Sequence, residues 1–215
     1  MAVSKYRHII WDWNGTLLND AWLCVDVMNG VLARRGMPSL TPERYQEVFG
    51  FPVVDYYRRV GFDFDRESFE VSGTEFIVEY ERRRHEARLQ PGTKETLKAV
   101  SELGISQSLL SAYQQKTLDE LTDYLGVRRY FVKVIGLDNH YARGKIENGK
   151  RWMREMRYGP HEVLLVGDTV HDHEVAEALG ADCVLIPSGH HTRERLETRG
   201  VSVFNTVGDV LAVLT

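Results

Sequence analysis

Short apolar runs alternate with amphipathic stretches through the second half of the chain. The apolar runs are typical of buried strands, and the stretches between them carry apolar residues at helical spacing. Expected strands cover 105–110, 132–137, 163–166, 183–186 and 201–204, and expected helices cover 116–125, 145–156, 171–179 and 192–198. This alternation predicts an α/β fold, a doubly wound parallel (Rossmann-like) sheet.

One more strand is expected near the N-terminus, over 6–11, and a long insert separates it from the others. The insert, residues 19–89, has the pattern of helices and no strand signal. Asp20, Thr41 followed by Pro42, and Asp65 are each suited to begin a helix there.

Pro91 and Gly92 break the pattern before Thr93 begins another helix. The sequence therefore predicts a core domain of residues 1–18 plus 90–215 and an inserted α-helical cap domain of residues 19–89.

Composition narrows the class of protein. The chain has 215 residues, 43% of them hydrophobic, and a net charge of -4, which is ordinary for a soluble globular protein and gives no reason to expect a nucleic acid partner. Cys24 and Cys183 alone define no disulfide framework. No signal peptide or membrane-spanning run is present. We expect a cytoplasmic protein, monomeric or dimeric, without a membrane partner.

Asp12 begins the first candidate site. It follows the apolar run Ile9-Ile10-Trp11 and opens the loop Asp12-Trp13-Asn14-Gly15-Thr16. Open α/β sheets bind ligands at the carboxyl ends of their strands, and an aspartate there can attack phosphorus as a nucleophile. Taken alone, the same residues are also typical of an ordinary surface turn after a strand.

Asp168 and Asp172 form the second candidate site, behind the strand 163–166. They are four residues apart across a helix start, so their side chains can point to the same spot. Paired carboxylates suit a hard cation such as Mg²⁺. Capping of the helix by either aspartate is the alternative.

Ser111 and Lys145 complete the set of candidate polar groups. Ser111 follows a predicted strand and can hydrogen-bond a phosphate oxygen, or simply form a local turn. Lys145 precedes the helix that leads to the Asp168 strand, and its charge can balance nearby carboxylates. Lys150 competes with it but lies deeper in the expected helix.

In order and context, these four positions resemble the motifs of the haloacid dehalogenase-like hydrolase superfamily. Those motifs are Asp-x-Asp-x-Thr behind an apolar strand, a strand-end Ser or Thr, a Lys, and Gly-Asp-x-x-x-Asp. They stand here as Asp12 to Thr16, Ser111, Lys145, and Gly167 to Asp172. The resemblance spans essentially the whole chain and is strongest to the phosphoglycolate phosphatase-like branch, which has a helical cap.

The resemblance implies a Mg²⁺-dependent phosphatase that acts on a small phosphorylated metabolite through an aspartyl-phosphate. Asp12 would be the nucleophile. The implied metal ligands are Asp12, the main-chain carbonyl of Asn14 and Asp168, with Asp172 ordering metal-bound water or Lys145. The implied contacts to the phosphoryl group are Gly15, Thr16, Ser111, Ala112 and Lys145.

Asn14 departs from the family pattern. In the family's phosphatases a carboxyl group at this position protonates the leaving oxygen and then activates water, which an amide cannot do. Losing a positioned acid or base lowers the rate by about 10²–10⁴-fold. We therefore expect a slow phosphatase, help from another acid such as His171, or substrates with good leaving groups such as acyl phosphates.

Two other classes of function are compatible with Asn14. One is a catalytically weak homologue that binds a phosphorylated ligand or a protein partner. The other is a hydrolase of carbon–halogen or carbon–phosphorus bonds, because such relatives also lack the second aspartate. The absence of lysine from residues 19–89 argues against the phosphonate enzymes, and the intact Gly-Asp-x-x-x-Asp argues against dehalogenation.

Substrate choice is expected to come from the cap. The segment 50–52 and the nearby Tyr56, Tyr57, Arg58 and Arg59 are candidates to face the site, an arginine being suited to a second anionic group. The histidine pairs 190–191 and 171–173 have no further ligands at a spacing that would complete a transition-metal site.

Overall fold

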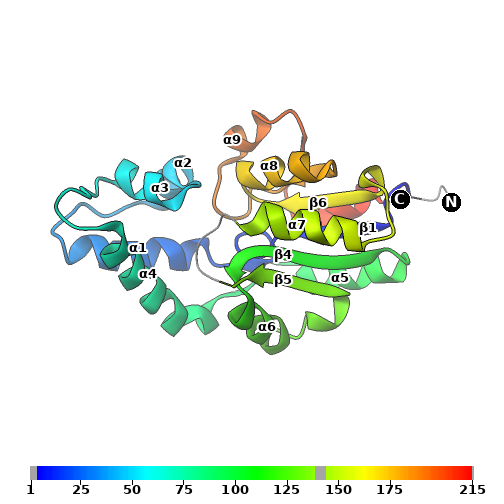
Figure 1. The fold of residues 1–215 in the computed structure, drawn as a ribbon, viewed down its shortest axis with the longest axis horizontal. Coiled ribbons are helices and arrows are strands. Elements are labelled where there is room, and N and C mark those ends of the chain that lie inside the picture. Colours follow the sequence, from blue (N-terminus) through cyan, green and yellow to red (C-terminus); the bar gives the residue numbers. More distant parts are fainter. Residues whose placement is uncertain (1–3, 139–143, 215) are drawn as a thin grey trace.

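The computed structural model describes residues 4–138 and 144–214, and its centre is a six-stranded parallel sheet (Figure 1). The strands follow the order β5-β4-β1-β6-β7-β8, which confirms the predicted α/β fold class. Their bounds are β1 His8–Trp11, β4 Ser106–Gln114, β5 Lys133–Leu137, β6 Val163–Gly167, β7 Asp182–Leu185 and β8 Ser202–Val203.

Helices cover both faces of this sheet. Apolar side chains of α5, α6 and η4 pack on one face, and those of α7 and α8 pack on the other. The bounds are α5 Thr93–Glu102, α6 Gln115–Tyr124, α7 Gly144–Glu155, α8 Val170–Leu179, α9 Arg193–Glu197 and the 3-10 helix η4 Val207–Val213, with shorter 3-10 turns at Arg128–Tyr130 (η2) and Pro160–Glu162 (η3). The expected strands and helices of this half all form, each within a few residues of its predicted bounds.

The insert forms a lobe of helices beside the sheet (Figure 1). Its elements are α1 Ala21–Ala33, α2 Pro42–Val48, α3 Val53–Val60, α4 Phe69–Arg83 and the 3-10 turn η1 Arg84–Glu86. They enclose their own apolar cluster, which includes Leu23, Met28, Val31, Tyr45 and Tyr57. The helical character predicted for the insert is therefore correct.

Two details of the insert differ from the expectation. A short antiparallel ribbon, β2 (Leu18–Asn19) with β3 (Arg88–Leu89), joins its two ends; its strands are too short to leave a periodic signal in the sequence. Asp65 does not begin a helix, because α4 starts after Ser68 and Asp65 lies in the preceding turn.

The strand register places the candidate residues at one edge of the sheet. Trp11 of β1 lies opposite Leu109 of β4 and Val166 of β6. Asp12 and Asp168 follow β1 and β6 directly, and Ser111 lies two residues beyond Leu109 within β4, so all three lie toward the same edge of the sheet.

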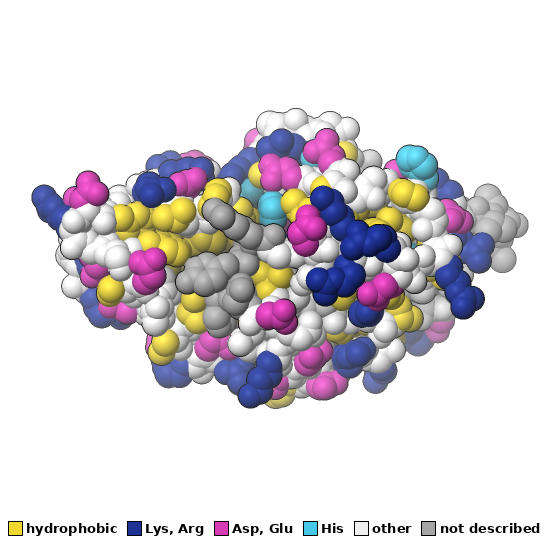
Figure 2. Space-filling model, viewed as in Figure 1, with side chains coloured by type: hydrophobic (Ala, Val, Ile, Leu, Met, Phe, Trp, Pro, Cys, Tyr) yellow, Lys and Arg dark blue, Asp and Glu magenta, His cyan; other side chains and the backbone are white. Residues whose placement is uncertain are grey.

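The surface carries charges of both signs. On the face seen in Figure 2, basic and acidic side chains are interspersed over the core and the insert. Among the described residues, no helix combines the length and apolar character needed to cross a membrane.

Candidate active site

Asp12 and Lys145 form the centre of the site. Asp12 directly follows β1, where its main-chain N–H donates to the Val166 carbonyl. The Lys145 ammonium, from the first turn of α7, donates to Asp12 Oδ1 at 2.5 Å and to Asp172 Oδ1 at 2.6 Å. All three side chains are buried, and only 3% of Lys145 is exposed. Lys145, rather than Lys150, contacts these carboxylates; Lys150 is partly exposed and pairs with Glu147.

Asp168 lies just beyond β6 and is fully buried. Its Oδ1 lies 2.9 Å from the Thr16 hydroxyl, whose single proton is shared with Asp12 Oδ2 at 3.1 Å, and its Oδ2 accepts from the His190 main-chain N–H at 2.6 Å. Gly15 has a positive φ of 78°, and a side chain there would collide with Asp168 and His190. Glycine is thus required where the Asp12 loop approaches the Asp168 loop.

Asp172 holds the turn between β6 and α8. Its Oδ2 accepts from the main-chain N–H of Asp168 and of Thr169 and from the Thr169 hydroxyl, while the Thr169 hydroxyl receives the Asp172 N–H. This is a capping box, so Asp172 both caps the helix and binds Lys145. Helix capping and a place in the carboxylate cluster, the two alternatives given by the sequence, are therefore compatible for Asp172.

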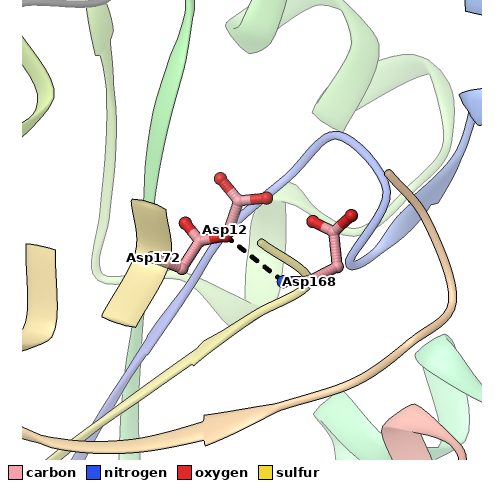
Figure 3. Close-up of side chains that lie close together, drawn as sticks. All are labelled: Asp12, Asp168 and Asp172. Atoms are coloured by element: carbon pink, nitrogen blue, oxygen red, sulfur yellow. Dashed lines mark hydrogen bonds between the residues drawn. The ribbon is translucent and has the colours of Figure 1, made fainter. Parts of the chain in front are cut away.

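The three carboxyl groups lie close together although they come from two separate loops (Figure 3). One ligand atom from each of Asp12, Asp168 and Asp172 lies within 4.8 Å of the others. Lys145 supplies one positive charge against three carboxylates, so the cluster carries an excess of negative charge.

This charge excess shifts the ionisation of the carboxyl groups. Burial, together with the neighbouring Asp172, raises the pKa of Asp12 to about 7, although Lys145 opposes the shift. Burial and the charges of Asp12 and Asp172 hold the pKa of Asp168 well above its ordinary value. Burial also acts on Asp172, but its contacts with Lys145 outweigh that effect and lower its pKa. The pKa of Lys145 is raised, because its two carboxylate partners outweigh its burial.

These residues fit a hard divalent cation. Buried oxygen donors with excess negative charge are the ligand set that Mg²⁺ takes. The main-chain carbonyl of Asn14 accepts no hydrogen bond within the described part of the chain, so it is also open to a ligand. Asp12 and Asp168 each have one side-chain or main-chain donor per oxygen, whereas Asp172 Oδ2 alone accepts three hydrogen bonds of the helix cap in addition to the Lys145 contact at Oδ1.

Ser111 lies inside a strand rather than after one. β4 continues to Gln114, and its pairing with β5 shifts register between Leu110 and Gln114. Within this irregular segment the Ser111 hydroxyl accepts from the Tyr113 main-chain N–H at 3.0 Å. The predicted strand end at Leu110 was therefore wrong. Ser111 and Ala112 lie in the irregular part of β4.

Asn14 makes contacts that sequence reasoning missed. Its Nδ2 donates to Asp20 Oδ2 at 2.8 Å and to the Tyr80 hydroxyl at 3.1 Å. Asp20 precedes α1 as predicted, but its side chain makes no capping bond; it accepts from the Gly15 N–H instead. The sequence singled out Asp20 for its place before a helix, and nothing local indicates that it turns toward Asn14.

His190 links the insert to Asp168 of the buried carboxylate cluster. Its main chain holds Asp168, its Nδ1 lies 2.7 Å from the Tyr45 hydroxyl of α2, and its ring packs on Phe49. Burial lowers its pKa, favouring the neutral imidazole. The neighbouring His191 accepts from the Val170 N–H and contacts the Phe49 carbonyl. Both histidines therefore hold loops together.

The other residues considered from the sequence have different surroundings. His171 packs on Phe51 with 4.8 Å between ring centroids, and its Nδ1 lies 3.1 Å from Glu174; the described contacts do not bring it to Asn14. Tyr56 and Tyr57 are buried inside the insert, so the expectation that they face the site was wrong.

The two arginines of α3 are also engaged elsewhere. Arg58 pairs with Asp55, and Arg59 donates to the Val48 carbonyl. Neither contacts the carboxylate cluster.

A Rossmann-like sheet with the Asp12 loop, a buried lysine and an acidic cluster at its carboxyl edge is the arrangement of a hydrolase of the haloacid dehalogenase type. The family model of haloacid dehalogenase-like hydrolases matches residues 9–186, and the chain belongs to this family.

Known proteins place the chain near one branch of that family. It is 26% identical over 194 residues to phosphoglycolate phosphatase of Pseudomonas syringae, covering 85% of this chain and 70% of the relative. It is 24% identical to phosphoglycolate phosphatase 1 of Pseudomonas aeruginosa, covering 98% and 80%. A haloacid dehalogenase-like hydrolase from Streptococcus pneumoniae has the same fold, with a TM-score of 0.85 at 17% identity, covering 98% of this chain and 99% of that one. The predicted resemblance to the phosphoglycolate phosphatase-like branch is confirmed.

Proposed function

We propose that this protein is a Mg²⁺-dependent phosphatase of a small phosphorylated metabolite and works through an aspartyl-phosphate on Asp12. The observation that supports this most is the pairing of Asp12 with the buried Lys145 beside Asp168. The phosphatase names of the relatives agree with it.

Each residue of the site has a proposed role in this reaction. Asp12 and Asp168, with the Asn14 carbonyl, would hold the metal, which when bound neutralises charge on the phosphoryl group. Lys145 holds Asp12 in place and is positioned to bind a phosphoryl oxygen. Asp172 fixes Lys145, while Gly15, Thr16, Ser111 and Ala112 line the adjoining loops. The core of residues 1–18 plus 90–215 would carry this chemistry, and the cap, residues 19–89, would select the substrate.

Phosphate release from a panel of phosphorylated metabolites that includes 2-phosphoglycolate tests this proposal. We expect release that requires both Mg²⁺ and Asp12, and that Asp12→Asn removes. Asp26→Asn, an exposed carboxylate on α1, serves as the matched control. Release that survives in Asp12→Asn would overturn the proposal.

Asn14 supports a second candidate, a catalytically weak homologue that binds a phosphorylated ligand. Its amide cannot exchange protons as a carboxyl group can. Isothermal titration would distinguish the two: tight binding of a phosphometabolite with no phosphate release favours the second candidate.

A further inference from the structure

The Asn14 amide is clamped on one edge by two buried residues. Asp20 is fully buried and Tyr80 is 5% exposed. Asp20 Oδ2 receives both the Tyr80 hydroxyl at 2.6 Å and Asn14 Nδ2 at 2.8 Å. The clamp joins the nucleophile loop to α1 and α4 of the insert.

The hydrogen-bond pattern allows only one orientation of this amide. The Asp20 carboxylate can only accept, and the single Tyr80 proton goes to Asp20. The Tyr80 oxygen therefore accepts from Asn14. An amide turned the other way would put its oxygen against two acceptors, so Nδ2 must face the clamp.

As a result, Asn14 has no proton left to donate to a substrate. Both hydrogens of Nδ2 are used by Asp20 and Tyr80. Its Oδ1 accepts no hydrogen bond from the described residues. The neighbouring donors are engaged by carboxylates: the Thr16 hydroxyl lies between Asp12 and Asp168, and Lys145 of α7 directs two of its three N–H groups to Asp12 and Asp172, which leaves the third for a phosphoryl oxygen.

We infer, on the basis of the proposed phosphatase function, that Asp20 and Tyr80 are positioning residues that make Asn14 an acceptor only. The enzyme therefore selects phosphate compounds whose leaving group departs without a proton, with acyl phosphates as the substrate class. A carboxylate leaving group is a stable anion, whereas an alkoxide requires protonation.

The reaction balances without a general acid. An Asp12 carboxylate oxygen bonds to phosphorus, and the bond from phosphorus to the leaving oxygen breaks with its electron pair, releasing a carboxylate. Water then attacks the phosphorus of the aspartyl-phosphate while one of its O–H groups donates to Asn14 Oδ1. The bond to Asp12 breaks, and both protons of the water leave with the phosphate as dihydrogen phosphate.

The dependence of rate on leaving group tests this inference without any variant. The substrates are acetyl phosphate, aryl phosphates of graded leaving-group acidity, and glycerol phosphate as the alkyl ester. We expect kcat/KM, which reports the step in which the leaving group departs, to rise steeply with leaving-group acidity, acetyl phosphate exceeding glycerol phosphate by about 10²–10⁴-fold. Similar, Asp12-dependent values of kcat/KM for all of them would reveal another proton donor and overturn the inference while the proposed function stands. Absence of Asp12-dependent turnover for every substrate would instead overturn both.

Variants test the clamp itself. Asp20→Asn is expected to lower kcat for acetyl phosphate by about 10–100-fold, because Asn14 loses its fixed orientation, with KM unchanged. The exchange variant N14D/D20N keeps an amide and a carboxylate paired but places the carboxyl group at position 14. It should turn over glycerol phosphate and show a flatter dependence on leaving group.

One control and one further variant distinguish a role in positioning Asn14 from a general effect on folding. Asp26→Asn removes an exposed carboxylate of the same helix and should leave kcat unchanged. Tyr80→Phe removes the other half of the clamp and should lower kcat for acetyl phosphate in the same way as Asp20→Asn. An unchanged kcat in folded Asp20→Asn and Tyr80→Phe would show that the clamp does not position Asn14.

Discussion

The Lys145 ammonium lies between Asp12 and Asp172, 2.5 Å from the first carboxylate and 2.6 Å from the second. It is the positive charge held inside the acidic cluster that Asp168 completes. The same contact thus serves the fold, by offsetting buried negative charge, and the proposed chemistry, by fixing the nucleophile. The two roles lead to separable predictions.

Lys145→Met should destabilise the protein strongly. Removing one partner of a buried ion pair costs about 3–5 kcal/mol, because the remaining charges stay buried without compensation. Urea unfolding measures the change in the free energy of unfolding. Lys150→Met removes a partly exposed lysine of the same helix that pairs with Glu147 at the surface, and should stay within about 0.5 kcal/mol of the wild type. A small effect at both positions would contradict the charge argument.

Asp168→Asn should separate stability from metal binding. Without Mg²⁺ the variant is expected to be more stable than the wild type, because one of three clustered buried carboxylates becomes neutral. Mg²⁺ at 100 times its dissociation constant should stabilise the wild type by about 2.7 kcal/mol and the variant by much less. Thermal unfolding with Mg²⁺ and with EDTA measures both effects. Equal stabilisation of the two proteins would argue against a metal site at Asp168.

His8 should make stability depend on pH. It is buried between Ser106 and Ser108, and burial lowers its pKa from 6.5 to about 4. Above pH 6.5 neither state is protonated. Between about pH 6.5 and 4 the unfolded chain binds a proton that the folded protein does not, so stability falls with pH by about 3 kcal/mol in total.

Urea unfolding across this pH range measures the loss attributable to His8. In His8→Gln the decline should be smaller by that amount, while the contribution of the carboxylates remains. Parallel pH curves for the two proteins would show that His8 binds a proton as readily in the folded state as in the unfolded chain, which would contradict the lowered pKa.

Arg195 should hold the insert against the core. Its Nη1 donates to the carbonyls of Gln46, Glu47 and Phe49 at the end of α2, where a cation is favoured by the helix dipole. Arg195→Met should speed amide hydrogen exchange in α2 and α3, with little change in the sheet. Arg199→Met, which removes an arginine paired with Glu174 of the core at 4.0 Å, is the control. Unchanged exchange in Arg195→Met would mean that other contacts hold the insert.

Much of the fold was predictable because its signals are local. Buried strands such as 163–166 and helix boundaries such as Thr41 and Gly180 depend on side chains adjacent in sequence, and the structure has them where expected. The two-residue strands of the ribbon and the start of α4 were missed because tertiary contacts, rather than periodicity, decide them.

Some residues of the candidate site were predictable from the sequence and others were not. Asp12, Lys145 and Asp168 were predictable because strand order brings strand ends to one edge, and the structure places them together. Their roles remain predictions. Tyr80 and His190 were not predictable, since Tyr80 reaches the site from a distant part of the chain and His190 holds Asp168 through its main chain. Asp20 is close in sequence, but its position before α1 predicted a helix cap rather than a contact with Asn14.

Covalent labelling of Asp12 tests the central claim most directly. The protein is mixed with Mg²⁺ and ³²P-labelled acetyl phosphate, quenched in acid within the first turnover, and digested for mass spectrometry. We predict one acid-stable, hydroxylamine-sensitive phosphoryl group on the peptide that contains Asp12, and none in Asp12→Asn. A phosphoryl group on another residue, or equal labelling of Asp12→Asn, would contradict the assignment of Asp12 as the nucleophile.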